Sequence, residues 1–102
     1  MISIYPHKFA RPKVLAAVVA YCQVKPYCPT IREIMEITGM GSGAHVKGTL
    51  VSLQNDDLID MVPMQARTIH PTQLGVIEAD MALFQDYLDK IKMEGGDNDD
   101  SK

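Results

Sequence analysis

The chain has no tryptophan, only two phenylalanines and only two cysteines among its 102 residues. A zinc site needs about four ligands, and the three histidines are scattered along the sequence, so we predict no metal site and no cofactor. No apolar run approaches the roughly 18 residues of a membrane-spanning helix. We therefore expect a cytoplasmic protein in which Cys22 and Cys28 are reduced and partly buried.

Residue groups that support catalysis are also missing from the sequence. There is no Ser/His/Asp set and no phosphate-binding loop, and the adjacent Asp56 and Asp57 diverge by about 100° at a helix end. The glycine-rich segment 39–43 has no strand before it, so we interpret it as a turn rather than a nucleotide-binding loop. The sequence does not predict an enzyme.

The charge is not strongly of one sign, and it is unevenly distributed. Residues 1–70 carry seven basic and five acidic side chains, a net charge of +2, whereas residues 71–102 carry three basic and eight acidic ones, a net charge of -5. Only the first part suits a polyanionic partner, and only mildly. The length and the hydrophobic content of 46% predict one domain with a modest core.

Residues 29–61 carry the most informative pattern of the sequence. Thr30 and Glu33 form a T-x-x-E capping box, in which each side chain bonds the backbone of the other residue. This predicts a helix over about 30–38. Gly39 follows it, and glycine commonly ends helices because it adopts left-handed φ without steric cost.

A second helix is predicted directly after this glycine turn. Ser42 caps the helix, which runs over about 42–55 with Val46, Leu50 and Leu53 on its buried face. Two short helices joined by a glycine turn are typical of the helix-turn-helix motif, whose second helix enters the major groove of DNA.

The flanking segments complete a winged helix-turn-helix fold. We predict an irregular arm over 1–10 and a first helix over 11–24, with Pro12 in its first turn. Strands at 58–63 and 67–70 form a short hairpin, the wing, directly after the motif. The predicted fold class is mainly α (α+β), with a three-helix core, a hairpin wing and a long C-terminal helix.

This C-terminal helix is predicted to begin after the cap Thr72 and to end at Gly95. Its apolar residues recur at alternating spacings of three and four, an a/d seam of about two and a half heptads. The seam consists of Leu74, Ile77, Met81, Phe84, Leu88 and Ile91. Such a helix packs on its own domain or pairs with a second copy, and we favour a homodimer because the seam outruns a core of this size. The predicted organisation is a winged-helix domain (1–70), a dimerisation helix (71–93) and a disordered acidic tail (94–102).

These positions also carry a family resemblance. The residues that carry it are Pro29, Thr30, Glu33, Ile34, Gly39, Ser42, Leu50, Leu53 and Ile59. Through them, the segment 11–70 resembles the winged-helix DNA-binding domain of the bacterial SOS repressor LexA and its relatives. The long C-terminal helix resembles the dimerisation helix of small regulators of the PadR type. The resemblance implies a dimeric, sequence-specific DNA-binding transcriptional regulator, such as a repressor of prokaryotic or phage origin.

The resemblance and the helical geometry together predict the residues that face double-stranded DNA. They are Lys13, Thr30, Arg32, Ser42, Ala44, His45, Lys47, Gly48, Val51, Asn55 and Arg67. Ala44 stands where the family has a base-reading asparagine, and Lys47 and Gly48 stand where it has acidic residues. The family's sequence specificity therefore does not transfer to this chain. Lys13 belongs to a basic cluster with Lys8 and Arg11 at the start of the first helix.

An alternative reading of the same face remains open. Ala44, Gly48 and Val51 are small or apolar, and they also suit a flat surface for a protein partner. The alternative function is a winged-helix interaction module, for example an antirepressor or an adaptor of the transcription or replication machinery, that does not bind DNA. Strong salt dependence of duplex binding distinguishes the first function from the second.

Overall fold

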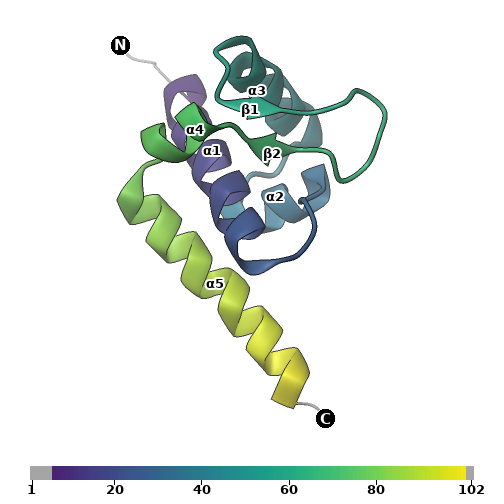
Figure 1. Ribbon diagram of the computed structural model, residues 1–102, viewed down its shortest axis with the longest axis vertical. Helices are drawn as coiled ribbons and strands as arrows, with labels where there is room; N and C mark the ends of the chain where they lie inside the picture. The colour runs from purple at the N-terminus through teal and green to yellow at the C-terminus, as the bar shows by residue number, and fades with distance from the viewer. Residues whose placement is uncertain (1–5, 101–102) are drawn as a thin grey trace.

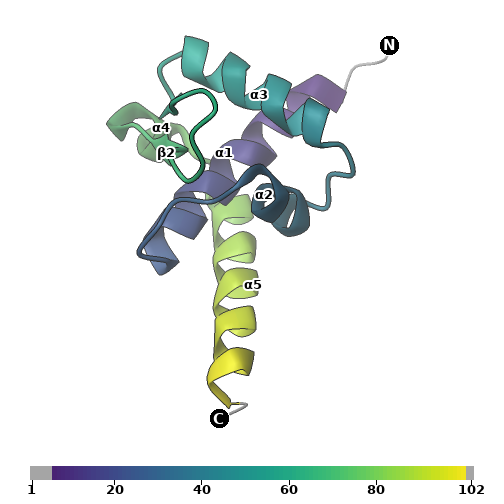
Figure 2. The same ribbon diagram turned by 90° about the vertical axis from the view of Figure 1, so that its right-hand side faces the viewer.

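The computed structural model describes residues 6–100, and side chains over residues 10–93. The described elements are α1 (Pro6–Val24), α2 (Ile31–Thr38), α3 (Gly43–Asn55), β1 (Ile59–Asp60), β2 (His70–Pro71), α4 (Gln73–Glu78) and α5 (Met81–Asp100). α1 is the central helix, and every other helix as well as β2 packs against it. α5 leads away from the cluster formed by α1, α2 and α3 (Figures 1 and 2). The predicted winged helix-turn-helix fold is confirmed.

The core surrounds α1. The eight consecutive residues from Val14 to Tyr21 are all buried, which is typical of a helix enclosed on every side rather than one with a single apolar stripe. Ile34 of α2, Leu50 of α3 and Ile59 of β1 are completely buried against it. No helix in the described part of the chain is both long and apolar enough to cross a lipid bilayer.

α1 begins earlier than predicted. The helix starts at Pro6, so residues 6–10 are helical rather than part of an irregular arm, and residues 1–5 lie outside the described residues. Proline is favoured at the first helical position, and Pro6 rather than Pro12 occupies it. Pro12 lies inside the helix, where it removes one backbone hydrogen bond.

The two motif helices are confirmed together with their caps. The Thr30 backbone N–H donates to Glu33 Oε1 at 2.8 Å, and the Glu33 N–H donates to Thr30 Oγ1 at 3.2 Å. Gly39 ends α2 with a left-handed φ of 78°. Ser42 caps α3 by accepting a hydrogen bond from the backbone N–H of His45 at 3.1 Å.

The wing is a longer loop with shorter strands than predicted. β1 and β2 pair antiparallel over two residues each, with Ile59 opposite Pro71, so most of the predicted strand residues belong to the loop. Two features of the loop account for the short strands. Thr68 Oγ1 accepts a hydrogen bond from the Val62 backbone N–H at 2.9 Å. Met64 also adopts a left-handed φ of 66°, which is incompatible with an extended strand.

The predicted continuous C-terminal helix is wrong, because the structure has two helices there. Ala79 is extended, with ψ of 141°, and it separates α4 from α5. Asp80 explains the break, because its Oδ1 accepts the backbone N–H of Leu83 at 3.0 Å and caps a new helix. The predicted end at Gly95 is also wrong, since α5 continues to Asp100. Glycine weakens a helix but does not forbid helical φ. Residues 101–102 of the predicted disordered tail lie outside the described residues.

α5 is attached to its own domain over its first half. Tyr87 and Ile91 are buried in the core, and Phe84 and Leu88 pack against it. Lys90 Nζ donates to the Glu36 and Ile37 carbonyl oxygens at 2.9 and 3.1 Å, where a cation complements the C-terminal end of α2.

The other half of the predicted seam is exposed. Leu74, Ile77 and Met81 are 44%, 75% and 70% exposed. The seam therefore does not form one continuous surface, and homodimerisation through the residues that remain exposed stays a prediction.

Candidate nucleic-acid interface

α3 turns one face to the core and another to solvent, as its spacing predicts. Val46, Leu50 and Leu53 are at most 1% exposed. The exposed residues, which we call the outer α3 face, are Ala44, Lys47, Gly48, Val51 and Asn55. This face is small and carries one charge. A helix surface of this kind lies close to the floor of a major groove, and alanine or valine contacts thymine methyl groups there.

Gly48 stands out on this face because no contact within the described part of the chain requires a glycine there. A Cβ built at Gly48 meets no atom of the described residues within 4 Å, and the residue lacks the left-handed φ of Gly39. By contrast, a Cβ at Gly75 lies 1.9 Å from the Leu58 carbonyl oxygen, so close packing requires that glycine. A glycine in the interior of an exposed helix costs about 1 kcal/mol relative to alanine. Gly48 leaves space on the outer side of α3 at the expense of stability.

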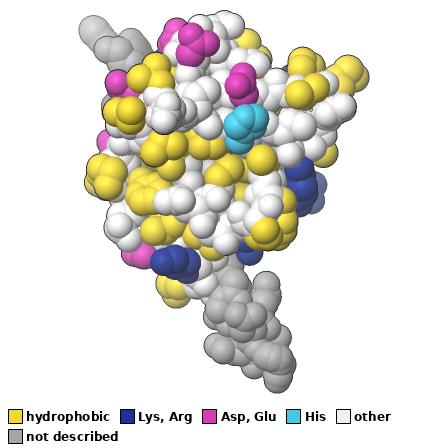
Figure 3. All heavy atoms as spheres, viewed as in Figure 1, with side chains coloured by type: hydrophobic (Ala, Val, Ile, Leu, Met, Phe, Trp, Pro, Cys, Tyr) yellow, Lys and Arg dark blue, Asp and Glu magenta, His cyan; other side chains and the backbone are white. Residues whose placement is uncertain are grey.

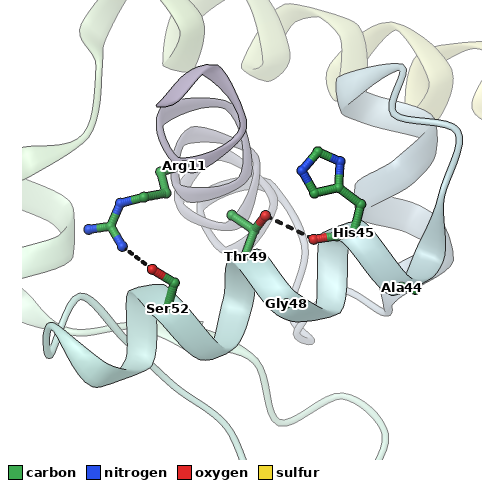
Figure 4. A pocket seen from close by; sticks show the side chains of 6 residues that line it. All are labelled: Arg11, Ala44, His45, Gly48, Thr49 and Ser52. Atoms are coloured by element: carbon green, nitrogen blue, oxygen red, sulfur yellow. Dashed lines mark hydrogen bonds between the residues drawn. The ribbon is translucent and has the colours of Figure 1, made fainter. Parts of the chain in front are cut away.

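A pocket of about 460 Å³ borders the outer α3 face on the side of α1. Its lining consists of Arg11, Ala44, His45, Gly48, Thr49 and Ser52. Figure 4 shows Arg11 and Ser52 at one end and His45 at the other, with Thr49 between them. Arg11 donates a hydrogen bond to Ser52 Oγ, and its Nη2 lies 2.6 Å from Asp56 Oδ2. The side chain of Arg11 on α1 therefore contacts the C-terminal end of α3, at Ser52 and at the C-cap residue Asp56.

Of the two basic residues of α1 whose side chains are described, Arg11 rather than Lys13 hydrogen-bonds to α3. The two residues are two positions apart and diverge by about 200° around the helix. Lys13 does not line the pocket. The side chain of Lys8, the third member of the predicted cluster, lies outside the described side chains. The sequence did contain a signal for Arg11, because it stands one turn before the buried Val14 and Leu15.

Thr30 and Arg32 lie at the N-terminus of α2, as predicted. Thr30 Oγ1 serves as the cap acceptor, and the Arg32 side chain is exposed in the first turn. The positive end of the helix dipole favours an anion at this position.

Arg67 in the wing is held by partners within the chain. Its Nη1 and Nη2 lie 3.1 Å from the two carboxylate oxygens of Glu33, and Nη1 also donates to the Cys28 carbonyl at 2.8 Å. The guanidinium lies 4.6 Å from the centroid of the Tyr27 ring. These four residues form what we call the wing brace, which ties the wing to the start of α2. The proposed DNA contact of Arg67 must compete with this ion pair.

The wing brace is charged at neutral pH. Burial opposes ionisation of Glu33, but hydrogen bonds from Arg67, from the Thr30 backbone and from Tyr21 outweigh it and lower the pKa of Glu33 from 4.5. The hydrogen bond to Glu33 in turn raises the pKa of Arg67. Burial is the main reason why the pKa of Tyr21 rises to about 12, so its hydroxyl remains a donor.

The tip of the wing is apolar and carries no charge between residues 61 and 66. Val62 is 49% exposed and Met64 is fully exposed. Hydrophobic side chains cover the wing tip at the upper right of Figure 3, and the Lys and Arg side chains visible on that face are separated from one another. The wing therefore offers apolar contact rather than a basic patch.

The two cysteines are free and half-buried. Burial, followed by the nearby Cys28 thiol, raises the pKa of Cys22 to about 12, so its reactive thiolate form is disfavoured. Over the described residues, the His, Cys, Asp and Glu side chains form no group of three or more that suits a metal ion.

Comparison with known proteins gives an independent finding. A family model described as the LexA DNA-binding domain matches residues 10–68, which is more than half of the chain. The matched segment contains α2, α3, β1 and most of α1, and it stops before α4 and α5. The resemblance of the C-terminal part to PadR-type dimerisation helices thus remains a prediction. Comparisons with curated proteins and with solved structures found no significant match.

Proposed function

This chain belongs to the LexA DNA-binding-domain family, and on that premise we propose that it is a small, dimeric, sequence-specific regulator of transcription. In this proposal α3 lies in the major groove of double-stranded DNA and the wing lies beside it. Two copies bind half-sites about one helical turn apart. The protein acts by occupying its site, as a repressor of a prokaryotic or phage gene does, and not by catalysis.

The outer α3 face is the observation that carries this proposal. It lies on the second helix of the motif, it is held rigidly by the buried Val46, Leu50 and Leu53, and it is left open by Gly48. Asn55 supplies an amide that pairs with an adenine edge, and Lys47 supplies a cation within reach of a guanine edge or a phosphate.

A second candidate function is supported by the apolar wing tip. Val62 and Met64 are exposed at the wing tip, and Val51 is exposed on α3. Exposed hydrophobic side chains suit a protein partner. In this alternative the domain keeps the winged-helix fold and binds a protein of the transcription or replication machinery.

Selection from random-sequence duplexes decides between the two functions. The protein is incubated with the pool at low and at moderate salt, and the bound duplexes are sequenced. An enriched palindrome supports a dimeric, sequence-specific DNA-binding protein, and the spacing of its half-sites gives the geometry of the dimer. Binding to the enriched duplex should weaken steeply with salt, by a slope of about -0.9 per neutralised phosphate. Recovery of no sequence at either salt concentration favours the protein-interaction module.

The Lys47→Glu substitution tests the role of α3 directly. Lys47 is exposed, so the variant should keep its thermal stability while its affinity for the enriched duplex falls. Lys92→Glu is the matched control, because it makes the same charge change at an exposed position of α5. Equal affinities for the two variants would remove α3 from the recognition role.

A further inference from the structure

We infer, on the basis of the proposed function, that the pocket between α1 and α3 is a binding site for a phosphodiester phosphate, and that Asp56 competes with this phosphate for Arg11. The pocket shares Ala44 and Gly48 with the outer α3 face. When this face enters a groove, the sugar-phosphate backbone that borders the groove comes to the pocket.

The polar groups of the pocket suit an oxyanion. Arg11 supplies a planar fork of N–H donors, which binds phosphate and carboxylate groups in the same bidentate way. Ser52 Oγ accepts a hydrogen bond from Arg11, which leaves the hydroxyl hydrogen of Ser52 to donate to the anion. Figure 4 shows that both side chains converge at one end of the pocket.

Asp56 occupies the position of such an anion within the chain itself. Its Oδ2 lies 2.6 Å from Arg11 Nη2, and the two residues are 45 positions apart in the sequence. The Asp56 side chain is 57% exposed and the Arg11 side chain is 33% exposed. The carboxylate can therefore move into solvent and yield Arg11 to a phosphate, while Arg11 stays at the pocket.

This arrangement makes Asp56 an internal competitor of the DNA backbone. In the free protein the carboxylate holds Arg11 and satisfies its charge, and every binding event must break that pair. Exposed ion pairs of this kind are weak, so Asp56 reduces the affinity only modestly. The reduction applies to any duplex sequence, since a phosphate contact carries no base information.

The Asp56→Asn substitution tests this competition. Affinity for the enriched duplex, measured by fluorescence anisotropy over a range of salt, should rise by about two- to fivefold. Asp57→Asn is the matched control. It removes the same charge from the neighbouring residue, and its left-handed φ of 63° suits asparagine. A gain in Asp57→Asn as large as that in Asp56→Asn would overturn the role of Asp56, because general repulsion would then explain both.

The Arg11 variants test the site itself. Arg11→Gln should weaken binding and lower the salt slope by about 0.9, the loss of one phosphate contact, and it should abolish the gain from Asp56→Asn. Arg11→Lys, which keeps the charge and a donor, should retain the wild-type slope. An unchanged slope in a folded Arg11→Gln variant refutes the phosphate site while the proposed function stands. Wild-type protein that binds no duplex refutes both.

Discussion

Replacing Gly48 with alanine should stabilise the protein and weaken its binding to DNA at the same time. The added Cβ meets no described atom within 4 Å, so the substitution creates no clash. Alanine is favoured over glycine in a helix interior by about 1 kcal/mol. In a domain of this size, that gain raises the melting temperature by roughly 4–8 °C, which thermal unfolding followed by circular dichroism measures directly.

The expected effect of the same variant on DNA binding has the opposite sign. Gly48 lies at the centre of the outer α3 face, where an added methyl group occupies space that the proposed complex fills with DNA. Overpacking of a tight contact costs about 1–3 kcal/mol, so the dissociation constant for the enriched duplex should rise by about tenfold. No change in the internal contacts of the domain accounts for such a loss.

Gly43→Ala is the matched control for this experiment. Gly43 lies on the same helix, but its Cβ would point inward, 3.6 Å from Met35 Sδ and 3.8 Å from Ile31 Cγ2, which are ordinary contact distances. This variant should fold and bind as the wild type does. A Gly48→Ala variant that is stabilised and binds with unchanged affinity would refute the close approach of α3 to the groove. A destabilised Gly48→Ala variant would refute the conclusion that a Cβ at this position meets no other atom of the described residues.

Three further predictions follow from other parts of the fold. Gly75→Ala should lower the free energy of unfolding by about 1–3 kcal/mol in urea titrations, because the added Cβ would lie 1.9 Å from the Leu58 carbonyl oxygen. A variant as stable as the wild type would contradict the packing of α4 against Leu58. Because the pKa of Glu33 is lowered in the folded state, its carboxylate contributes stability that is complete above pH 4.5 and is lost as pH falls through the folded-state pKa. The free energy of unfolding of the Glu33→Gln variant should therefore change less with pH in acid unfolding titrations. Ile77→Asp, at a side chain that is 75% exposed, should give stable monomers in light scattering, and a persistent dimer would place the interface elsewhere.

The helices of the motif were predictable because their signals are local. The capping box of Thr30 and Glu33 needs only residues three apart, and both of its hydrogen bonds are present. The inward positions of α3 follow from the helical repeat alone, and Val46, Leu50 and Leu53 are buried as expected. Patterns of this range depend little on the rest of the chain.

The C-terminal part was harder to predict because two local signals compete there. The spacing of apolar residues favours one long helix, whereas Asp80 caps a new one, and a side-chain cap with an extended Ala79 decides the outcome. Heptad spacing also does not reveal which partner covers a seam. Leu88 and Ile91 meet the domain's own core, whereas Ile77 remains exposed.

The basic residues show a different limit of the sequence. Arg11 and Arg67 each bond a residue more than 30 positions away, Asp56 and Glu33 respectively, and no spacing rule connects such pairs. Both arginines are ordinary surface cations in the sequence. The fold gives Arg67 a place in the wing brace, and it aims Arg11 at α3.

These ion pairs bear on the proposal that the regulator binds DNA as two copies. Lys47 on the outer α3 face and Arg32 at the start of α2 are exposed cations, whereas Arg11 and Arg67 are paired with carboxylates. Electrostatic affinity for DNA grows with the number of phosphates neutralised, so a single copy gains little. A second copy doubles that number, and the joined half-sites bind at a high effective concentration. Residues 1–70 carry a net charge of only +2, so a second copy adds more here than it would for a strongly basic domain, and the exposed Ile77 is part of the apolar surface that this copy would cover.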